Sequence, residues 1–337
     1  MLKFYKIMFF NSMILGTLIA ISSYSWFGMW MGLEINLLSI IPLFNSTKNM
    51  YTSEASLKYF LTQAMASLIL LLSLILMMIS TELIAPLMSL AKEILLNSAL
   101  LTKLGAAPFH YWFPEVMEGL NWMNCMILLT WQKIAPMCIL IMSNPKTEFM
   151  VVIILTCLVI SSIMGFNQIS LRKIMAYSSI NHIAWMLSAM LVSVSVWFIY
   201  LIVYLIITIN ISSIFAYSKL MSINQLTLFM NQNKTNKISL MINFMSLGGL
   251  PPFLGFLPKW FTINWMIIEN FTILAFLLII LTLIMLFVYI RIMLSSLIIQ
   301  FSESKIPSKN LSLFPIYLIN FISLSSLFGC TFLFNFI

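Results

Sequence analysis

The chain has 337 residues, of which 62% are hydrophobic and 8% are charged. Soluble domains carry about a quarter charged residues, so these few charges cannot cover a soluble surface, and a separate soluble domain is excluded. The net charge of +8 comes from basic residues scattered through short loops. Without a basic face or interleaved aromatic side chains, this charge does not indicate nucleic-acid binding.

Apolar runs of ~20 residues recur along the whole chain, and each is long enough to cross a bilayer as a helix. A transmembrane β-barrel would need alternating segments of ~10 residues, whereas these runs are continuous. The sequence therefore predicts an all-α polytopic membrane protein with about eleven transmembrane helices. The predicted spans are 7–25, 27–45, 59–79, 93–110, 121–142, 149–166, 172–190, 194–218, 238–256, 271–298 and 312–335.

The first apolar run follows Lys3 and Lys6 and so imitates a signal peptide. No small-residue cleavage site follows it, because Ser22-Ser23-Tyr24 leads into Trp26. We expect this run to be retained as the first span.

The distribution of Lys and Arg predicts the orientation of the spans. When the spans alternate, twelve of the 17 basic residues fall on the N-terminal side, and only Lys92 and Lys146 fall on the other. Basic loops stay on the cytoplasm-like side of a membrane. We therefore expect the N-terminus on that side and, with an odd number of spans, the C-terminus on the opposite side.

Two blocks of the sequence resemble each other. GAAPFHYWFP begins at Gly105 and GLPPFLGFLP begins at Gly249, with two Pro and one Phe at identical spacing. Paired spans interrupted by Gly and Pro are typical of repeat-built transporters near their ion sites. The pattern predicts a single membrane domain, 1–337, with repeat-like halves at roughly 1–145 and 146–298 and a C-terminal helix at 312–335.

Four charged residues fall within or beside apolar spans: Glu34, Lys103, Lys133 and Lys259. A charge at the centre of a span costs about 2.5–3.5 kcal/mol of insertion free energy, so the presence of each of these four residues requires an explanation. Glu34 and Lys133 are central in their spans. Lys103 could instead extend toward the end of its span, and Lys259 could be a loop residue at the membrane surface.

Each of the three lysines has a proline within five residues, namely Pro108, Pro136 and Pro258. A proline inside a span frees backbone groups that neighbouring polar groups or water must satisfy. Removal from water weakens the hold of a lysine on its proton, and a nearby carboxylate strengthens it. A titratable group tuned near neutral pH can both load and release a proton, so this pattern indicates a proton path.

Two histidines are weaker candidates for the same path. His110 ends the fourth predicted span, and His182 lies in the middle of the seventh beside Ser178, Ser179 and Asn181. A lone buried histidine is more often a structural residue with its hydrogen bonds satisfied than a functional one. Both are therefore secondary candidates.

The sequence predicts no cofactor and no metal on this chain. The four cysteines, Cys125, Cys138, Cys157 and Cys330, lie inside apolar stretches without a CxxC motif and are expected to be core residues. No phosphate-binding glycine loop, haem motif or iron–sulfur spacing is present in the sequence.

Four segments resemble the NADH dehydrogenase subunit 2 family, whose members are antiporter-like membrane subunits of respiratory complex I. The segments are LTKLGAAPFHYWFPEVMEGL (101–120), LLTWQKIAP (128–136), KIMAYSSINHIAWM (173–186) and LGGLPPFLGFLPKW (247–260). The resemblance covers nearly the whole chain. It implies an antiporter-like fold of about eleven spans, with two inverted repeats and two broken helices.

The resemblance also implies roles for the buried charges. Glu34 would tune Lys103, and Lys133 and Lys259 would continue a proton relay. His182 matches the family's histidine after the YSS segment and would bridge the relay. The shortage of acidic residues, with no Asp in the chain, argues against a stand-alone pump.

The family implies a core membrane subunit of proton-pumping NADH:ubiquinone oxidoreductase. FMN, iron–sulfur clusters and ubiquinone are expected elsewhere in that complex, and the expected partners are neighbouring antiporter-like and small membrane subunits and the bilayer, including cardiolipin. The bias toward Met, Ile, Phe, Asn and Lys indicates an AT-rich organellar genome. The expected location is the mitochondrial inner membrane, with the N-terminus in the matrix and the C-terminus in the intermembrane space.

Two alternatives remain open from the residues alone. One is a free-standing cation/proton antiporter, which would need a site rich in carboxylates and carbonyls, whereas Glu34 is the one acidic residue that we expect to be buried. The other is a structural membrane subunit whose buried charges are fixed ion pairs.

Overall fold

The computed structural model describes residues 4–46, 49–80, 86–232, 234–251, 253–298 and 321, and nearly all of them are helical. The predicted all-α class is confirmed. The helices are α1 (Phe4–Ser22), α2 (Trp26–Phe44), α3 (Met50–Ser80), α4 (Pro86–Leu104), α5 (Trp112–Gly119), α6 (Trp122–Leu129), α7 (Trp131–Ser143), α8 (Thr147–Phe166), α9 (Leu171–Val192), α10 (Val194–Ser218), α11 (Ile223–Gln232), α12 (Lys234–Gly248), α13 (Phe256–Ile268) and α14 (Thr272–Ile298).

Among the described residues, seven segments are long and apolar enough to cross a membrane. The predicted spans 149–166, 172–190, 194–218 and 271–298 agree with α8, α9, α10 and α14 to within two residues at each end. The span predicted at 312–335 lies outside the described residues except for residue 321. Eleven spans therefore stay a prediction with which the structure is compatible.

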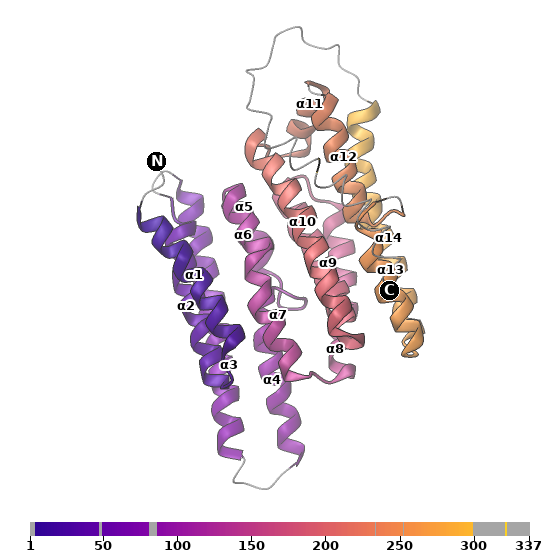
Figure 1. The fold of residues 1–337 in the computed structure, drawn as a ribbon. Coiled ribbons are helices and arrows are strands. Elements are labelled where there is room, and N and C mark those ends of the chain that lie inside the picture. Colours follow the sequence, from indigo (N-terminus) through magenta and orange to yellow (C-terminus); the bar gives the residue numbers. More distant parts are fainter. Residues whose placement is uncertain are drawn as a thin grey trace. The chain divides into compact units, whose positions relative to one another are not determined.

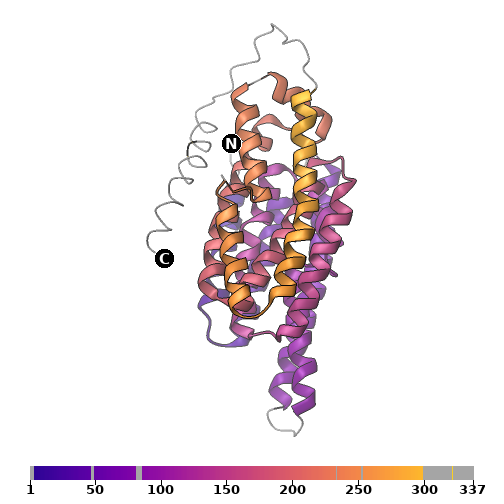
Figure 2. The same ribbon diagram turned by 90° about the vertical axis from the view of Figure 1, so that its right-hand side faces the viewer.

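The chain divides into two compact units, Met1–Ile153 and Ile154–Ile337. In the first unit, α1 packs along α2, and α3 lies beside α4 (Figure 1). In the second unit, α9 and α10 pack together, both contact α13, and α12 packs against α14 (Figure 2). The relation of these units to two inverted repeats stays a prediction.

The contact between α1 and α2 depends on small residues. A Cβ atom on Gly32 would lie 2.5 Å from the backbone nitrogen of Ala20, and one on Gly16 would lie 2.8 Å from the backbone nitrogen of Asn36. In a membrane, small residues let helix backbones approach closely, and packing then replaces the hydrophobic effect as the source of stability. This contact fixes the part of α2 that carries Glu34 and Asn36.

The predicted break at Gly105 is present and has a defined cause. Gly105 has a φ of +73°, a backbone conformation that glycine adopts without a Cβ penalty. Its N–H donates to the Thr102 carbonyl at 3.2 Å, and the Ala106 N–H donates to the Leu101 carbonyl at 3.0 Å. These two hydrogen bonds form a Schellman motif, which ends α4.

The second predicted break has the same construction. Gly249 has a φ of +77° and donates its N–H to the Ser246 carbonyl at 3.0 Å, while the Leu250 N–H donates to the Met245 carbonyl at 3.3 Å. The sequence match between the two glycine blocks therefore corresponds to two equivalent helix ends, one in each unit.

A third interruption was not predicted, because the apolar run at 121–142 indicated one continuous span. The structure divides this span at Thr130 into α6 and α7. Thr130 has φ −109° and ψ −74°, and its hydroxyl donates to the Met126 carbonyl at 2.6 Å. Pro136 lies inside α7 and has no N–H for the carbonyl four residues earlier, so the first turn of α7 lacks one helical hydrogen bond. The prediction also missed α11, which forms within the polar loop at 221–237.

Candidate functional site

Glu34 and Lys103 lie within the first unit on different helices. Glu34 is half-buried near the middle of α2, as predicted. Lys103 is 7% exposed in the last turn of α4, directly before the Gly105 break. The two side chains interact electrostatically. A cation in the last turn also faces the negative end of the helix dipole.

A small polar cavity adjoins Lys103. It offers about 10 Å³ to the centre of a water molecule, which is near the lower limit for one bound water. The residues that line it come from α2, α3, α4 and α7, and they are Leu33, Asn36, Leu37, Tyr59, Gln63, Lys103, Gln132 and Pro136.

Two side-chain amides form one wall of this cavity. Asn36 Nδ2 donates to Gln132 Oε1 at 3.2 Å, and Gln132 Nε2 donates back to Asn36 Oδ1 at 3.0 Å. The Tyr59 hydroxyl donates to Gln132 Oε1 at 3.4 Å, and Gln63 Nε2 donates to the Lys103 carbonyl at 3.4 Å. These bonds join α2, α3, α4 and α7 around the Lys103 side chain.

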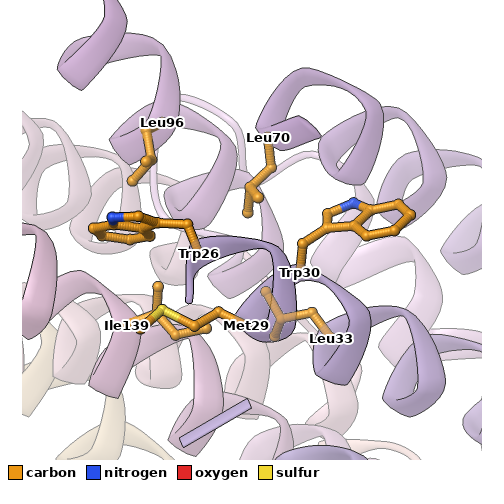
Figure 3. A pocket seen from close by; sticks show the side chains of 7 residues that line it. All are labelled: Trp26, Met29, Trp30, Leu33, Leu70, Leu96 and Ile139. Carbon is orange, nitrogen blue, oxygen red and sulfur yellow. The ribbon is translucent and has the colours of Figure 1, made fainter. Parts of the chain in front are cut away.

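A second cavity nearby is apolar, and its lining side chains surround it in Figure 3. Its residues are Trp26, Met29, Trp30, Leu33, Leu70, Leu96 and Ile139, and it leaves no room for a water molecule. Leu33 lines both cavities. A dry wall of this kind confines water to the polar cavity, because an apolar cavity offers water no hydrogen-bond partner.

Lys133 lies in the first turn of α7, next to Gln132. Its side chain is 3% exposed, as its central position in the predicted span indicated. Because Gln132 lines the cavity beside Lys103, the start of α7 brings Lys133 into the same region of the first unit.

Lys259 lies in α13 of the second unit and is 7% exposed. Its Nζ atom donates to the Gly248 carbonyl at 2.9 Å and to the Leu247 carbonyl at 3.3 Å. It also lies 5.5 Å from the ring centroid of Trp185. Lys259 is thus a buried residue held against the Gly249 break, and the alternative of a loop residue is wrong.

Two aromatic side chains connect His182 to Lys259. His182 is 4% exposed, and its Nδ1 atom is 2.9 Å from the hydroxyl oxygen of Tyr200. The Tyr200 ring stacks on Trp185 with centroids 6.5 Å apart, and Trp185 contacts Lys259. The structure therefore connects His182 to the environment of Lys259 within the second unit.

His110 lies in the turn after the Gly105 break and is 2% exposed. Its Nδ1 atom is 3.3 Å from the Pro108 carbonyl oxygen, and its ring packs on Tyr111 with centroids 4.5 Å apart. These contacts hold its ring in the turn, and His110 does not line the cavity beside Lys103.

Sequence analysis missed several polar residues of this region. Lys92 was assigned to a loop, but it lies in α4, about three turns before Lys103, and is 7% exposed. Asn36 and Gln132 were not singled out. The available signal was their position inside apolar spans, since Asn36 is two residues after Glu34 and Gln132 directly precedes Lys133.

Within the described ranges, no group of three or more His, Cys, Asp or Glu side chains could hold a metal ion. Cys125, Cys138 and Cys157 are free thiols, and Cys330 lies outside the described residues.

The fold and these residues define a polytopic α-helical membrane protein with buried lysines beside breaks in its helices. A family model for the membrane part of NADH:quinone oxidoreductases and Mrp antiporters matches residues 23–285. Proteins named NADH-ubiquinone oxidoreductase chain 2 are similar over most of the chain. The one from Anopheles gambiae is 48% identical, covering 90% of this chain and 89% of the relative. The one from Aedes aegypti is 47% identical, covering 95% of each. The chain belongs to the NADH-ubiquinone oxidoreductase chain 2 family.

Solved structures show that the fold is shared more widely. A chain of respiratory complex I from Thermus thermophilus with bound aureothin superposes with a TM-score of 0.86 at 21% identity, covering 96% of this chain and 78% of that one. A chain of the Mrp complex from Dietzia gives a TM-score of 0.74 at 15% identity, covering 89% and 61%. The antiporter-like fold expected from the sequence is confirmed.

Proposed function

We propose that this chain is a proton-translocating membrane subunit of NADH:ubiquinone oxidoreductase, respiratory complex I. The observation that carries the proposal is the burial of Lys103, Lys133 and Lys259, each at 7% exposure or less, at or near an interruption of a helix. Buried ionisable residues in spans are costly and mark ion pathways. Family membership indicates respiratory complex I as the assembly in which such a path operates.

Glu34, Lys103, Lys133 and Lys259 form the proton relay in this proposal. Glu34 modulates Lys103 electrostatically, Lys133 continues the path from the same unit, and Lys259 carries it in the second unit with His182 as the bridging residue. His110 is a structural residue of the first break.

Electron transfer takes place in other subunits, which hold FMN and iron–sulfur clusters and which bind ubiquinone. Each charge moved against a membrane potential requires about 2.3 kcal/mol per 100 mV, so the driving force comes from outside this chain. The neighbouring antiporter-like and small membrane subunits are its partners, with cardiolipin among the surrounding lipids. The chain lies in the mitochondrial inner membrane with its N-terminus in the matrix and its C-terminus in the intermembrane space.

The test is Lys133→Ala in the assembled complex, in a genetically tractable system that carries the equivalent subunit. NADH oxidation and proton pumping are measured together with the amount of assembled complex. The matched control is Lys146→Ala, since Lys146 is an exposed lysine between α7 and α8. We expect normal assembly in both variants and a joint loss of coupled turnover and pumping only in Lys133→Ala.

Full pumping stoichiometry in Lys133→Ala would contradict the relay and favour a structural subunit with fixed charges. Cation/proton exchange by the purified chain on its own would favour the free-standing antiporter. The absence of aspartate from the sequence argues against the free-standing antiporter, because a cation site needs several carboxylate or carbonyl oxygens.

A further inference from the structure

An arginine joins α8 to α14 in the second unit. Arg291 Nη2 donates to the Phe166 carbonyl at 2.8 Å, and the guanidinium carbon lies 5.4 Å from the centroid of the Phe166 ring. Because the last carbonyls of a helix lack partners within it, this contact fixes the guanidinium at the end of α8. A guanidinium carries several N–H donors, and the residues that the structure describes accept one hydrogen bond from Arg291. Its remaining donors are therefore available to a ligand.

Arg291 is far from any carboxylate in the described part of the second unit. Glu269 is the one acidic residue there, and it directly follows α13, before α14 begins at Thr272. With a rise of about 1.5 Å per residue, Thr272 and Arg291 lie about 29 Å apart along α14. Glu269 is thus at the opposite end of this helix. Any counter-ion of Arg291 therefore comes from outside these residues.

The lengths of the two helices place Arg291 at a membrane surface. The hydrocarbon core of a bilayer is about 30 Å thick, which matches the distance from Thr272 to Arg291. The distance from Thr147 to Phe166 in α8 is equally long. Both helices therefore reach the level of the lipid headgroups where Arg291 contacts Phe166. The phosphates of the bilayer lie at this level, and the planar fork of an arginine matches the oxygens of a phosphate.

The Phe166 and Phe287 rings form an exposed apolar surface beside the guanidinium. Their centroids are 5.6 Å apart, the angle between the rings is 11°, and the two residues are 39% and 50% exposed. From Phe287 toward the middle of α14, helical spacing puts Leu283, Ile280 and Phe276 on the same face, and all three are exposed. A cation at headgroup level above an apolar strip has the polarity of a phospholipid, whereas a dissolved anion would need only the cation.

We propose that this end of the second unit binds one anionic phospholipid. The guanidinium of Arg291 donates hydrogen bonds to its phosphate, and an acyl chain lies along Phe287 and Leu283. An anionic headgroup is favoured over a zwitterionic one, because the described residues offer no carboxylate here to hold a choline or ethanolamine group. The predicted orientation also places this end among the basic loops, which attract anionic lipids. The site includes neither Lys259 nor His182, so it does not rest on the proposed function.

The first test is a cryo-EM map of the assembled complex that contains this chain, reconstituted in nanodiscs with phosphatidylglycerol. We expect phosphate density within hydrogen-bond distance of the Arg291 guanidinium and continuous acyl-chain density along Phe287. A protein carboxylate at the guanidinium, from Glu303 or from a neighbouring subunit, would overturn the inference. Phosphate density without an acyl chain would do the same, because it would indicate a free anion.

The second test uses a photoreactive phosphatidylglycerol and a phosphatidylcholine with the same diazirine-bearing acyl chain. The readout is the ratio of α14 labelling by the two probes in the assembled complex, in a system whose equivalent subunit carries this arginine and phenylalanine pair. We expect Arg291→Gln to lower the ratio about fivefold, as for one basic residue at an anionic surface. The matched control is Lys146→Gln, which removes an exposed charge from the loop before α8 and leaves the ratio unchanged.

An unchanged ratio in Arg291→Gln would overturn the site. Excess inorganic phosphate at constant ionic strength is expected to leave labelling intact, and displacement of the probe would instead indicate a site for free phosphate.

The apolar half of the site is tested separately with Phe287→Ala and its control Phe276→Ala. Both residues are exposed on nearly the same face of α14, but Phe287 alone stacks on Phe166. We expect labelling by the anionic probe to fall in Phe287→Ala and to persist in Phe276→Ala, whereas equal labelling would overturn the acyl-chain contact. Phe287→Ala and the map remain decisive if Arg291→Gln does not assemble.

Discussion

The Nζ atom of Lys259 lies 2.9 Å from the carbonyl oxygen of Gly248, so a side chain from α13 closes the end of α12 across the break between them. The last carbonyls of a helix have no partner within the helix, and a cation is favourable at that end. Lys259 is thereby held in place by the same irregular backbone that separates the two helices.

Gly249→Ala is expected to disturb this arrangement. The φ of +77° costs a residue with a Cβ atom about 1–2 kcal/mol, and the new Cβ would lie 2.7 Å from Lys259 Cδ and 2.9 Å from its Nζ. We expect less assembled complex on native gels and reduced pumping by the complex that does assemble. The control is Gly248→Ala, whose Cβ would make an ordinary 3.4 Å contact with Leu286. Equal behaviour of the two variants would show that the Gly249 conformation does not hold Lys259.

Gly32→Ala is expected to separate α1 from α2. The added Cβ would lie 2.5 Å from the backbone nitrogen and 2.7 Å from the Cα of Ala20, and backbone atoms cannot move aside as a flexible side chain can. Overpacking of this kind costs about 1–3 kcal/mol. The measurement is the yield of assembled complex and its thermal stability. In the control Gly165→Ala, the new Cβ would meet the flexible Met285 side chain at 3.1 Å, and a larger loss there than in Gly32→Ala would refute the packing argument.

Tyr200→Phe is expected to lower pumping while leaving assembly intact. The change removes the hydroxyl that lies 2.9 Å from His182 Nδ1 and keeps the ring stacked on Trp185. Because the partner of one ring nitrogen decides which nitrogen carries the proton, His182 would lose its orientation. Proton-to-electron ratio is the decisive measurement, with Tyr217→Phe as the exposed control. Normal pumping in Tyr200→Phe would exclude His182 from the path through this contact.

Lys58→Ala is expected to have little effect. Lys58 lies 3.0 Å from both Glu54 and Glu115 and so connects α3 to α5. All three side chains are well exposed, and exposed ion pairs contribute little to stability and are screened by salt. We expect assembly and pumping like the unchanged complex at high and at low ionic strength. A strong loss in Lys58→Ala at low ionic strength, matched by a loss in the unchanged complex at high salt, would instead show that this contact holds α5 in place.

Much of the fold could be predicted because the membrane imposes simple rules. The ends of α9, α10 and α14 follow from the lengths of apolar runs, and the breaks at Gly105 and Gly249 follow from Gly and Pro at matching positions. The division at Thr130 could not be predicted in this way. Thr130 lies in an apolar run without a glycine, and the one proline of that run, Pro136, lies six residues further along the chain.

The sequence alone determined that the chain spans a membrane. It also determined that Glu34, Lys103 and Lys133 lie within or at the end of spans, because the cost of burying a charge depends on its position in an apolar run. Only the tertiary structure decided that Asn36, Gln132 and Lys103 border one cavity. That outcome depends on how three helices are rotated and packed against one another. No local pattern of hydropathy encodes those rotations, since they are set by contacts between residues far apart in the sequence.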